Sequence, residues 1–235
     1  MTDVGRALVH IGTHKTGTTS FQRWAEANRE ELLVRTKMLY FEGRFGENHL
    51  ELALACIRRD RSMPSMREHP EWCLEDWQED TRHNVSVQSF RWTGDLLLSA
   101  EGMSYVRHGD EVETLVRLLR PRAVSVVAVL RDPASFLESY RQELLDQGFE
   151  LSRDPQSFAY VEEDSWLARY DELIAAYAGV LGPEHVHTVG YEESLDRYGS
   201  TIPAILEQWG ADPQRLPRWD DVQENVTERF DGVAR

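Results

Sequence analysis

The architecture of this chain is best inferred from one segment, Ile11-Gly12-Thr13-His14-Lys15-Thr16-Gly17-Thr18-Thr19-Ser20. It follows a short apolar run, residues 7–11, and leads into a stretch in which Phe21, Trp24 and Leu32 recur at helical spacing. A glycine-containing loop between a strand and a helix binds phosphate, because the first N–H groups of the helix lack intrahelical partners and the helix dipole favours negative charge. The segment therefore predicts a phosphate-binding loop.

The position of the lysine separates this loop from those that bind nucleoside triphosphates. Gly12 and Gly17 fit the pattern G-x-x-x-x-G-K-[ST], but Thr18 stands where that pattern has lysine, and Lys15 precedes the second glycine. In an ATP or GTP site, the lysine after the second glycine reaches the terminal phosphates, and Mg²⁺ neutralises the remaining charge. A lysine inside the loop indicates a shorter and less charged group.

A second strand-to-helix junction lies about 115 residues further along the chain. Residues 123–130 are almost all apolar and rich in valine, as expected of a strand buried on both faces of a parallel sheet. Arg131 follows the strand, and Ser139 lies eight residues later in a stretch with helical periodicity. A guanidinium fork and a hydroxyl are suitable phosphate ligands.

The two junctions together resemble those of sulfotransferases that use 3′-phosphoadenosine 5′-phosphosulfate (PAPS). The resemblance implies that Lys15 contacts the oxygen bridging phosphate and sulfate. It also implies that Arg131 and Ser139 bind the 3′-phosphate, and that the 5′-phosphate is held by the small residues and backbone amides of the loop, namely Thr16, Gly17, Thr18, Thr19 and Ser20. A sulfuryl group carries less charge than a γ-phosphoryl group, so one ammonium beside the leaving oxygen can replace a metal ion.

The acceptor must lose a proton as it attacks sulfur, so a base is expected at the same edge of the sheet. Residues 95–100 predict a strand that ends at Glu101, which makes this carboxylate the first candidate. A capping role at a helix start is the alternative for Glu101. His14 is the second candidate, as base or as a cofactor ligand, because it flanks the lysine of the loop, and His49 is the third.

The order of the elements predicts a doubly wound, mostly parallel α/β sheet of the P-loop NTPase type, flanked by helices. We expect a single domain over residues 1–235. The expected strands are 7–11, 38–41, 95–100, 123–130 and 186–191, and the expected helices are 18–34, 109–119, 134–147, 165–180 and 200–209.

Three further segments stand outside this alternation. Residues 43–94 predict an insertion rich in loops and helices, with one helix near 48–59, that covers the acceptor site; its aromatic residues either contact the acceptor or seal the insertion onto the core. The polar segment 147–163 is a candidate lid. Arg229, in the polar tail, is the nearest candidate for the C-terminal cofactor contact that the resemblance implies.

Composition and charge limit the classes of binding partner and cofactor that are expected for this protein. The chain has 41 acidic and 26 basic residues, a net charge of −15, which argues against a dedicated nucleic-acid binder. Neither an apolar stretch long enough to span a membrane nor a signal peptide is visible, so a cytoplasmic enzyme is expected. The two cysteines have no metal-ligand spacing, and no metal site is predicted.

These observations favour metal-independent transfer of a sulfuryl group from PAPS to a hydroxyl or amine of a small-molecule or carbohydrate acceptor. One alternative is a nucleotide-dependent kinase with a degenerate phosphate loop, which needs Asp132 to hold Mg²⁺. The other is a protein that binds a nucleotide or a partner without catalysis. The sequence does not identify the acceptor or the oligomeric state.

Overall fold

Five parallel strands form the centre of the molecule. The computed structural model describes residues 4–219 of the chain. The strands lie in the order β2-β3-β1-β4-β5, with Val9 of β1 in register with Leu98 of β3 and Val126 of β4. Their bounds are β1 (Ala7–His10), β2 (Met38–Tyr40), β3 (Asp95–Ser99), β4 (Val124–Leu130) and β5 (Val186–Gly190). All five predicted strands are confirmed.

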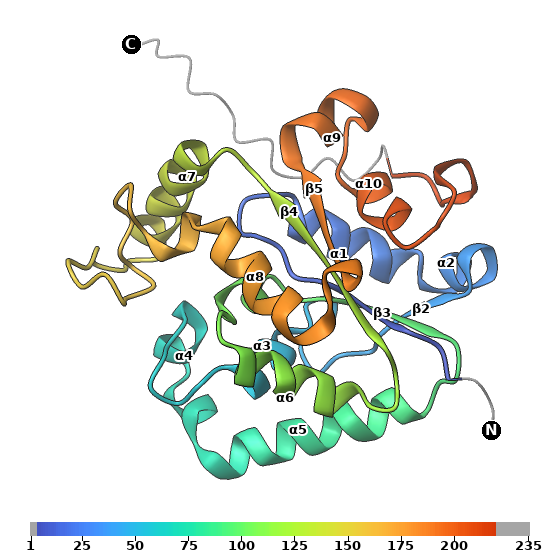
Figure 1. Cartoon of the computed structure of the whole chain (residues 1–235), viewed down its shortest axis with the longest axis horizontal. Coiled ribbons are helices and arrows are strands. Elements are labelled where there is room, and N and C mark those ends of the chain that lie inside the picture. Colours follow the sequence, from blue (N-terminus) through green and yellow to red (C-terminus); the bar gives the residue numbers. More distant parts are fainter. Residues whose placement is uncertain (1–3, 220–235) are drawn as a thin grey trace.

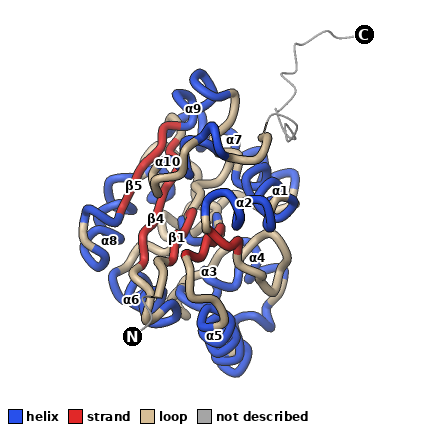
Figure 2. Tube along the Cα trace, turned by 90° about the vertical axis from the view of Figure 1, so that its right-hand side faces the viewer, coloured by secondary structure: helices blue, strands red, loops and turns tan. Residues whose placement is uncertain are grey.

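Helices cover both faces of this sheet. Successive side chains of a strand point to opposite faces, so Leu96 and Leu98 of β3 join one buried cluster and Leu97 joins the other. The first cluster includes helical side chains from residues 50–56, 75–90, 109–119, 133–146 and 170–181, and the second includes helical side chains from residues 18–27, 29–36 and 202–207. In Figure 2 the strands lie between α8 (Tyr170–Leu181) on one side and α1 (Thr18–Ala27) on the other. The doubly wound α/β prediction is confirmed.

The helices are shown with the strands in Figure 1. Their bounds are α1 (Thr18–Ala27), α2 (Arg29–Thr36), α3 (Leu50–Cys56), α4 (Pro64–Glu68), α5 (Glu75–Phe90), α6 (Gly109–Leu119), α7 (Pro133–Asp146), α8 (Tyr170–Leu181), α9 (Tyr191–Tyr198) and α10 (Ile202–Glu207). Among residues 4–219, no helix combines the length and apolar character needed to cross a membrane.

The predicted helix over residues 18–34 is two helices. The backbone leaves the helical region at Asn28, where φ is −110° and ψ is 18°. The Asn28 side chain donates a hydrogen bond to the Trp24 carbonyl over 2.8 Å, which satisfies an acceptor near the end of α1. Beyond the break, the Arg29 guanidinium donates to the carbonyls of Tyr40 and Phe41, fixing α2 against the end of β2.

The insertion is more helical than the sequence indicates. The insertion contains both loops and helices, as expected, but the sequence assigns no helix to the position of α5, which spans 16 residues. The buried residues of α5 are spaced along one face of the helix, but three of the four are polar: Gln78, Thr81, Val85 and Ser89. Hydrophobic periodicity therefore cannot reveal this helix.

Arg122 forms hydrogen bonds that join several backbone segments at the edge of the sheet where the strands begin. Its buried guanidinium donates to the backbone carbonyls of Gly5, Ser89, Trp92 and Gly94. These carbonyls precede β1, close α5 and lead into β3, so one side chain ties the insertion to the central strands. At the opposite edge, the loops that follow β1, β3 and β4 meet, and there the strand order changes direction around β1.

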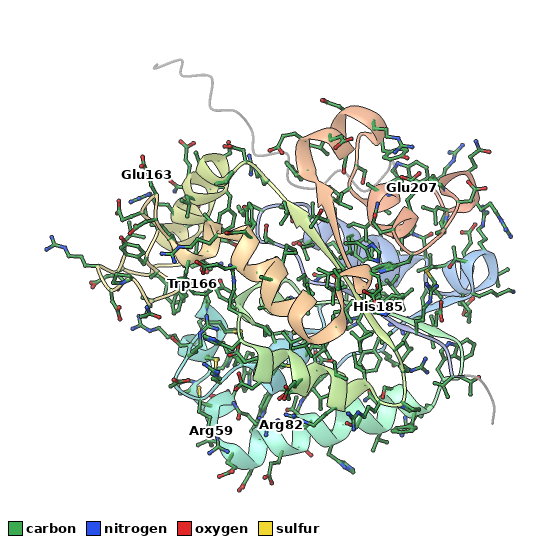
Figure 3. The ribbon with its side chains drawn as sticks, viewed as in Figure 1. Arg59, Arg82, Glu163, Trp166, His185 and Glu207 are labelled. Atoms are coloured by element: carbon green, nitrogen blue, oxygen red, sulfur yellow. The ribbon has the colours of Figure 1, made fainter. Side chains whose placement is uncertain are left out.

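The segment between α7 and α8 is packed against the insertion. Trp166, labelled in Figure 3, lies under the guanidinium groups of Arg61 and Arg107, with 4.8 and 5.2 Å to the ring centroid. Phe158 is buried and is contacted by Arg67 of α4. Within the candidate lid, residues 147–163, Phe158 makes one such arginine–aromatic contact, and Trp166 makes two just beyond it.

Candidate functional site

The loop after β1 has the backbone shape of an anion-binding turn. Gly12 and Gly17 have φ values of 82° and 80°, and Lys15 between them has a φ of 61°. A Cβ atom on Gly12 would lie 3.1 Å from the Cα of Glu101, so a larger residue there would crowd the neighbouring segment. The glycine thus lets the loop and the chain after β3 come into main-chain contact.

The start of α1 is open to an anion. Gly17 is its N-cap residue and provides no side-chain cap, and its first turn contains no acidic residue. The N–H of Phe21 is bonded to the carbonyl of Gly17, the N-cap residue of the helix. The sequence expectation of a helix N-terminus facing a phosphate is consistent with this geometry.

Two threonine hydroxyls expected near the phosphate form hydrogen bonds within the loop instead. The buried side chains of Thr16 and Thr18 both donate to the Thr13 carbonyl, over 2.5 and 3.2 Å. The Thr13 hydroxyl in turn donates to the carbonyl of Val129 in β4. In this arrangement the threonines shape the loop, and the backbone N–H groups are the donors available to a phosphate. Thr19 is exposed.

Arg131 and Ser139 lie together beside the phosphate loop. One guanidinium nitrogen of Arg131 donates to the Ser139 hydroxyl over 3.1 Å and to the Lys15 carbonyl over 3.4 Å. The Arg131 Nε atom is buried without a hydrogen-bond partner in the described part of the chain. Glu192 lies 3.8 Å from Nε, and the guanidinium stands over the Tyr191 ring. The two predicted phosphate sites are therefore adjacent.

Glu143 is a site residue that the sequence prediction missed. Its Oε2 atom lies 3.9 Å from Nζ of Lys15, and this buried oxygen accepts no hydrogen bond from residues 4–219. Glu143 follows Ser139 by four residues on α7, so both project from one face of that helix. Helical spacing from Ser139 is the sequence signal that could have found it.

His14 and Glu101 form a pair. Nδ1 of His14 lies 3.8 Å from a carboxylate oxygen of Glu101. The imidazole packs against the rings of Tyr105 and Tyr140, with centroids 5.1 and 5.4 Å away, and its Nε2 is buried without a partner among the described residues. The hydroxyls of the two tyrosines are 2.6 Å apart, and burial raises the pKa of both. The first two base candidates thus share one place.

A pocket of about 150 Å³ opens beside this pair. The volume is well above the ~10–15 Å³ that a single water molecule needs, so a small organic group fits. The pocket lies between the loop edge of the sheet and the insertion. Its lining residues are His14, Asn48, Leu50, Met63, Pro64, Ser65, Glu68, Glu101, Gly102, Tyr105, Tyr140, Glu143 and Gln147.

His49 has a structural role, which removes the third base candidate. Its ring is fully buried, with Nδ1 accepting from the Ser99 N–H and Nε2 donating to the Phe41 carbonyl, each over 2.9 Å. Burial lowers the pKa of His49 to about 3. The side chain therefore joins β3 to the start of the insertion and has no nitrogen left for a substrate.

Asp132 is also committed elsewhere. Its carboxylate is the N-cap of α7 and accepts a hydrogen bond from the Ser135 N–H over 2.9 Å, which lowers the pKa of Asp132. The kinase alternative relied on this carboxylate as a ligand for Mg²⁺. Arg229, the candidate C-terminal contact, lies outside the described residues.

Comparison with solved structures agrees with this architecture. A sulfotransferase from Alicyclobacillus acidocaldarius is similar to 91% of this chain and 84% of its own, with a TM-score of 0.56 and 15% sequence identity. The chain has a sulfotransferase-like fold. No family model matches its sequence, and no curated protein matches it.

Proposed function

We propose that this protein is a sulfotransferase that moves a sulfuryl group from PAPS to a small acceptor. The proposal rests above all on the adjacency of Lys15, Arg131 and Ser139 at the open start of α1. The likeness to a solved sulfotransferase supports it at the level of the fold.

The residues present fit the donor. The uncapped helix start supplies backbone N–H groups for the 5′-phosphate. The buried Nε of Arg131, which makes no hydrogen bond within residues 4–219, is a donor beside the expected 3′-phosphate position. Lys15 and Arg131 place two positive charges on this side of the site. PAPS, when bound, supplies the activated sulfuryl group.

In the proposed transfer, side chains of this protein stabilise the developing charge and accept the proton. The acceptor oxygen or nitrogen forms a bond to sulfur while the bond from sulfur to the 5′-phosphate oxygen breaks, and the electron pair stays on that oxygen. The Lys15 ammonium stabilises the charge that develops there. The proton lost by the acceptor passes to the His14–Glu101 pair, in which Glu101 orients the imidazole and stabilises its protonated form. Tyr105 and Tyr140 line the pocket beside this pair.

The test compares two ligands by thermal unfolding of the intact protein. A ligand that binds only the folded state raises the midpoint of unfolding, and the rise grows with the logarithm of the ligand concentration above its Kd. Stabilisation by adenosine 3′,5′-bisphosphate, with none by ADP and Mg²⁺, is the expected result. The reverse result would overturn the proposal in favour of the kinase, and stabilisation by neither ligand would favour the non-catalytic alternative.

A further inference from the structure

The pocket beside the His14–Glu101 pair has an unusual distribution of charge. Three carboxylates line it: Glu68 from α4, Glu101 after β3 and Glu143 from α7. His14 is the only basic side chain among its lining residues, and Lys15 reaches only Glu143. Carboxylates therefore outnumber basic side chains among the lining residues of this pocket.

Two of these carboxylates are available to a ligand. Glu68 is exposed and takes part in no ion pair within residues 4–219. Glu143 has a buried oxygen with no hydrogen bond in that part of the chain, and its ion-pair partner Lys15 is required at the leaving oxygen during transfer. A carboxylate that loses its counter-ion in a partly buried place is costly unless another cation replaces it.

The rest of the pocket is suited to an organic body. The buried rings of Tyr105 and Tyr140 form one wall, and apolar side chains of the insertion, Leu50, Met63 and Pro64, line another part. A pocket with apolar walls and a few charged groups fixes both the identity and the orientation of a small ligand.

We infer that the acceptor is a small organic cation, whose protonated amino group is bound by Glu68 and Glu143 while its nucleophilic group faces the His14–Glu101 pair. This inference deepens the proposed function, but the binding preference itself does not depend on catalysis. A net charge of −15 acts in the same direction, because the field of the whole protein attracts cations and repels anionic acceptors.

Three phenols that differ only in the charge of their tail test the inference. Tyramine carries an ammonium, 4-propylphenol is its neutral isostere, and 3-(4-hydroxyphenyl)propanoate is anionic. Calorimetric titration of the intact protein, with and without saturating adenosine 3′,5′-bisphosphate, is expected to show tyramine binding at least tenfold more tightly than 4-propylphenol, with the anion weakest. Equal or tighter binding of the neutral phenol, or binding of none of the three, would overturn the inference.

Variants assign the preference to the named carboxylates. Glu68→Gln and Glu143→Gln are each expected to reduce the advantage of tyramine over 4-propylphenol at least threefold. Glu79→Gln, which removes one negative charge from an exposed position of α5 outside the pocket, is the matched control and is expected to leave the ratio unchanged. An unchanged ratio in both pocket variants would show that these carboxylates do not bind the cation.

The two proposals fail in different ways. A protein that prefers tyramine but is not stabilised by the bisphosphate has the inferred pocket without the proposed activity. A protein that binds the bisphosphate and shows no charge preference among the phenols has the proposed donor site and a different acceptor.

Discussion

The Nζ atom of Lys15 lies 3.9 Å from Oε2 of Glu143, and this ion pair joins the phosphate loop to α7. The same lysine is tied to Arg131 through its backbone carbonyl. Lys15 therefore stands where the phosphate loop, the proposed acceptor pocket and the helix after β4 meet. Its side chain is 37% exposed, which leaves it room to turn from Glu143 toward a bound donor.

Removing the ammonium tests the centre of the proposed mechanism. Lys15→Ala is expected to lower kcat by ~10²–10³-fold, the usual cost of losing one group that stabilises charge in a transition state. Rates are measured with PAPS and the best acceptor. Lys37→Asn, at the other positive-φ lysine and away from the site, is the control. A near-normal rate for Lys15→Ala contradicts its assignment.

Arg131 is expected to bind the 3′-phosphate and so to favour nucleotides that carry one. In the unchanged protein, adenosine 3′,5′-bisphosphate should bind more tightly than AMP, which lacks that phosphate. Arg131→Ala is expected to weaken the bisphosphate by ~10–100-fold, because it removes a charge-assisted hydrogen bond, and to affect AMP much less. Calorimetry of the two nucleotides provides the measurement. An equal loss of affinity for both would place Arg131 elsewhere.

His14 and Glu101 are expected to act as one unit. His14→Asn and Glu101→Gln should each lower kcat by ~10²–10⁴-fold, the usual contribution of general-base catalysis. Since each variant disables the same proton acceptor, the double variant should be little slower than the slower single one. If the two losses multiply, the residues act independently and the pairing seen at 3.8 Å has no catalytic meaning.

Two buried histidines make the fold sensitive to acid. Burial lowers the pKa of His10 and of His49 from 6.5 to about 3. Between pH 6.5 and 3, these histidines are therefore protonated in the unfolded chain but neutral in the folded protein. The free energy of unfolding that they contribute above pH 6.5 is lost as the pH falls toward 3. Each histidine contributes a slope of ~1.4 kcal/mol per pH unit over that range.

Urea unfolding between pH 6.5 and 5 measures this slope. His49→Asn is expected to remove the contribution of one histidine, whatever its effect on stability at neutral pH. His83→Gln, at an exposed position, should leave the slope unaltered. A slope that does not change in the His49 variant would mean that the buried imidazole is not the group that titrates.

Arg122 is expected to be the most sensitive position at the far edge of the sheet. Arg122→Met keeps much of the side-chain volume but leaves the carbonyls of Gly5, Ser89, Trp92 and Gly94 without their donor. We expect a loss of ~3–5 kcal/mol in the free energy of unfolding, as for other buried charged networks that lose a partner. Arg120→Met, two residues away and exposed, should cost little.

The sequence predicts the sheet well because strands that are buried on both faces of a parallel sheet consist of runs of apolar residues. The resemblance to PAPS-dependent sulfotransferases singles out Arg131 and Ser139, which lie within hydrogen-bond distance of each other in the structure. The sequence does not predict α5, whose buried face is mainly polar, or the break at Asn28, which depends on contacts of Arg29 with the end of β2.

The acceptor pocket is harder to foresee. Glu68, Glu101 and Glu143 come from three elements far apart in the chain, and only the packing of the insertion against the loop edge brings them together. His49 illustrates the converse: the sequence makes it the third candidate base, but neighbouring backbone groups use both of its nitrogens.

The close approach of Gly12 to Glu101 separates two tasks that evolution can alter independently. In the proposed mechanism, main-chain contact between the loop after β1 and the segment after β3 sets the spacing between the transferring group and the proton acceptor. The insertion contributes other lining residues of the pocket, among them Leu50, Met63 and Glu68. Because buried side chains of α3 and α5 also belong to the core, substitution of such lining residues, and not exchange of the whole insertion, is the route to a new acceptor range that leaves the proposed machinery of transfer in place.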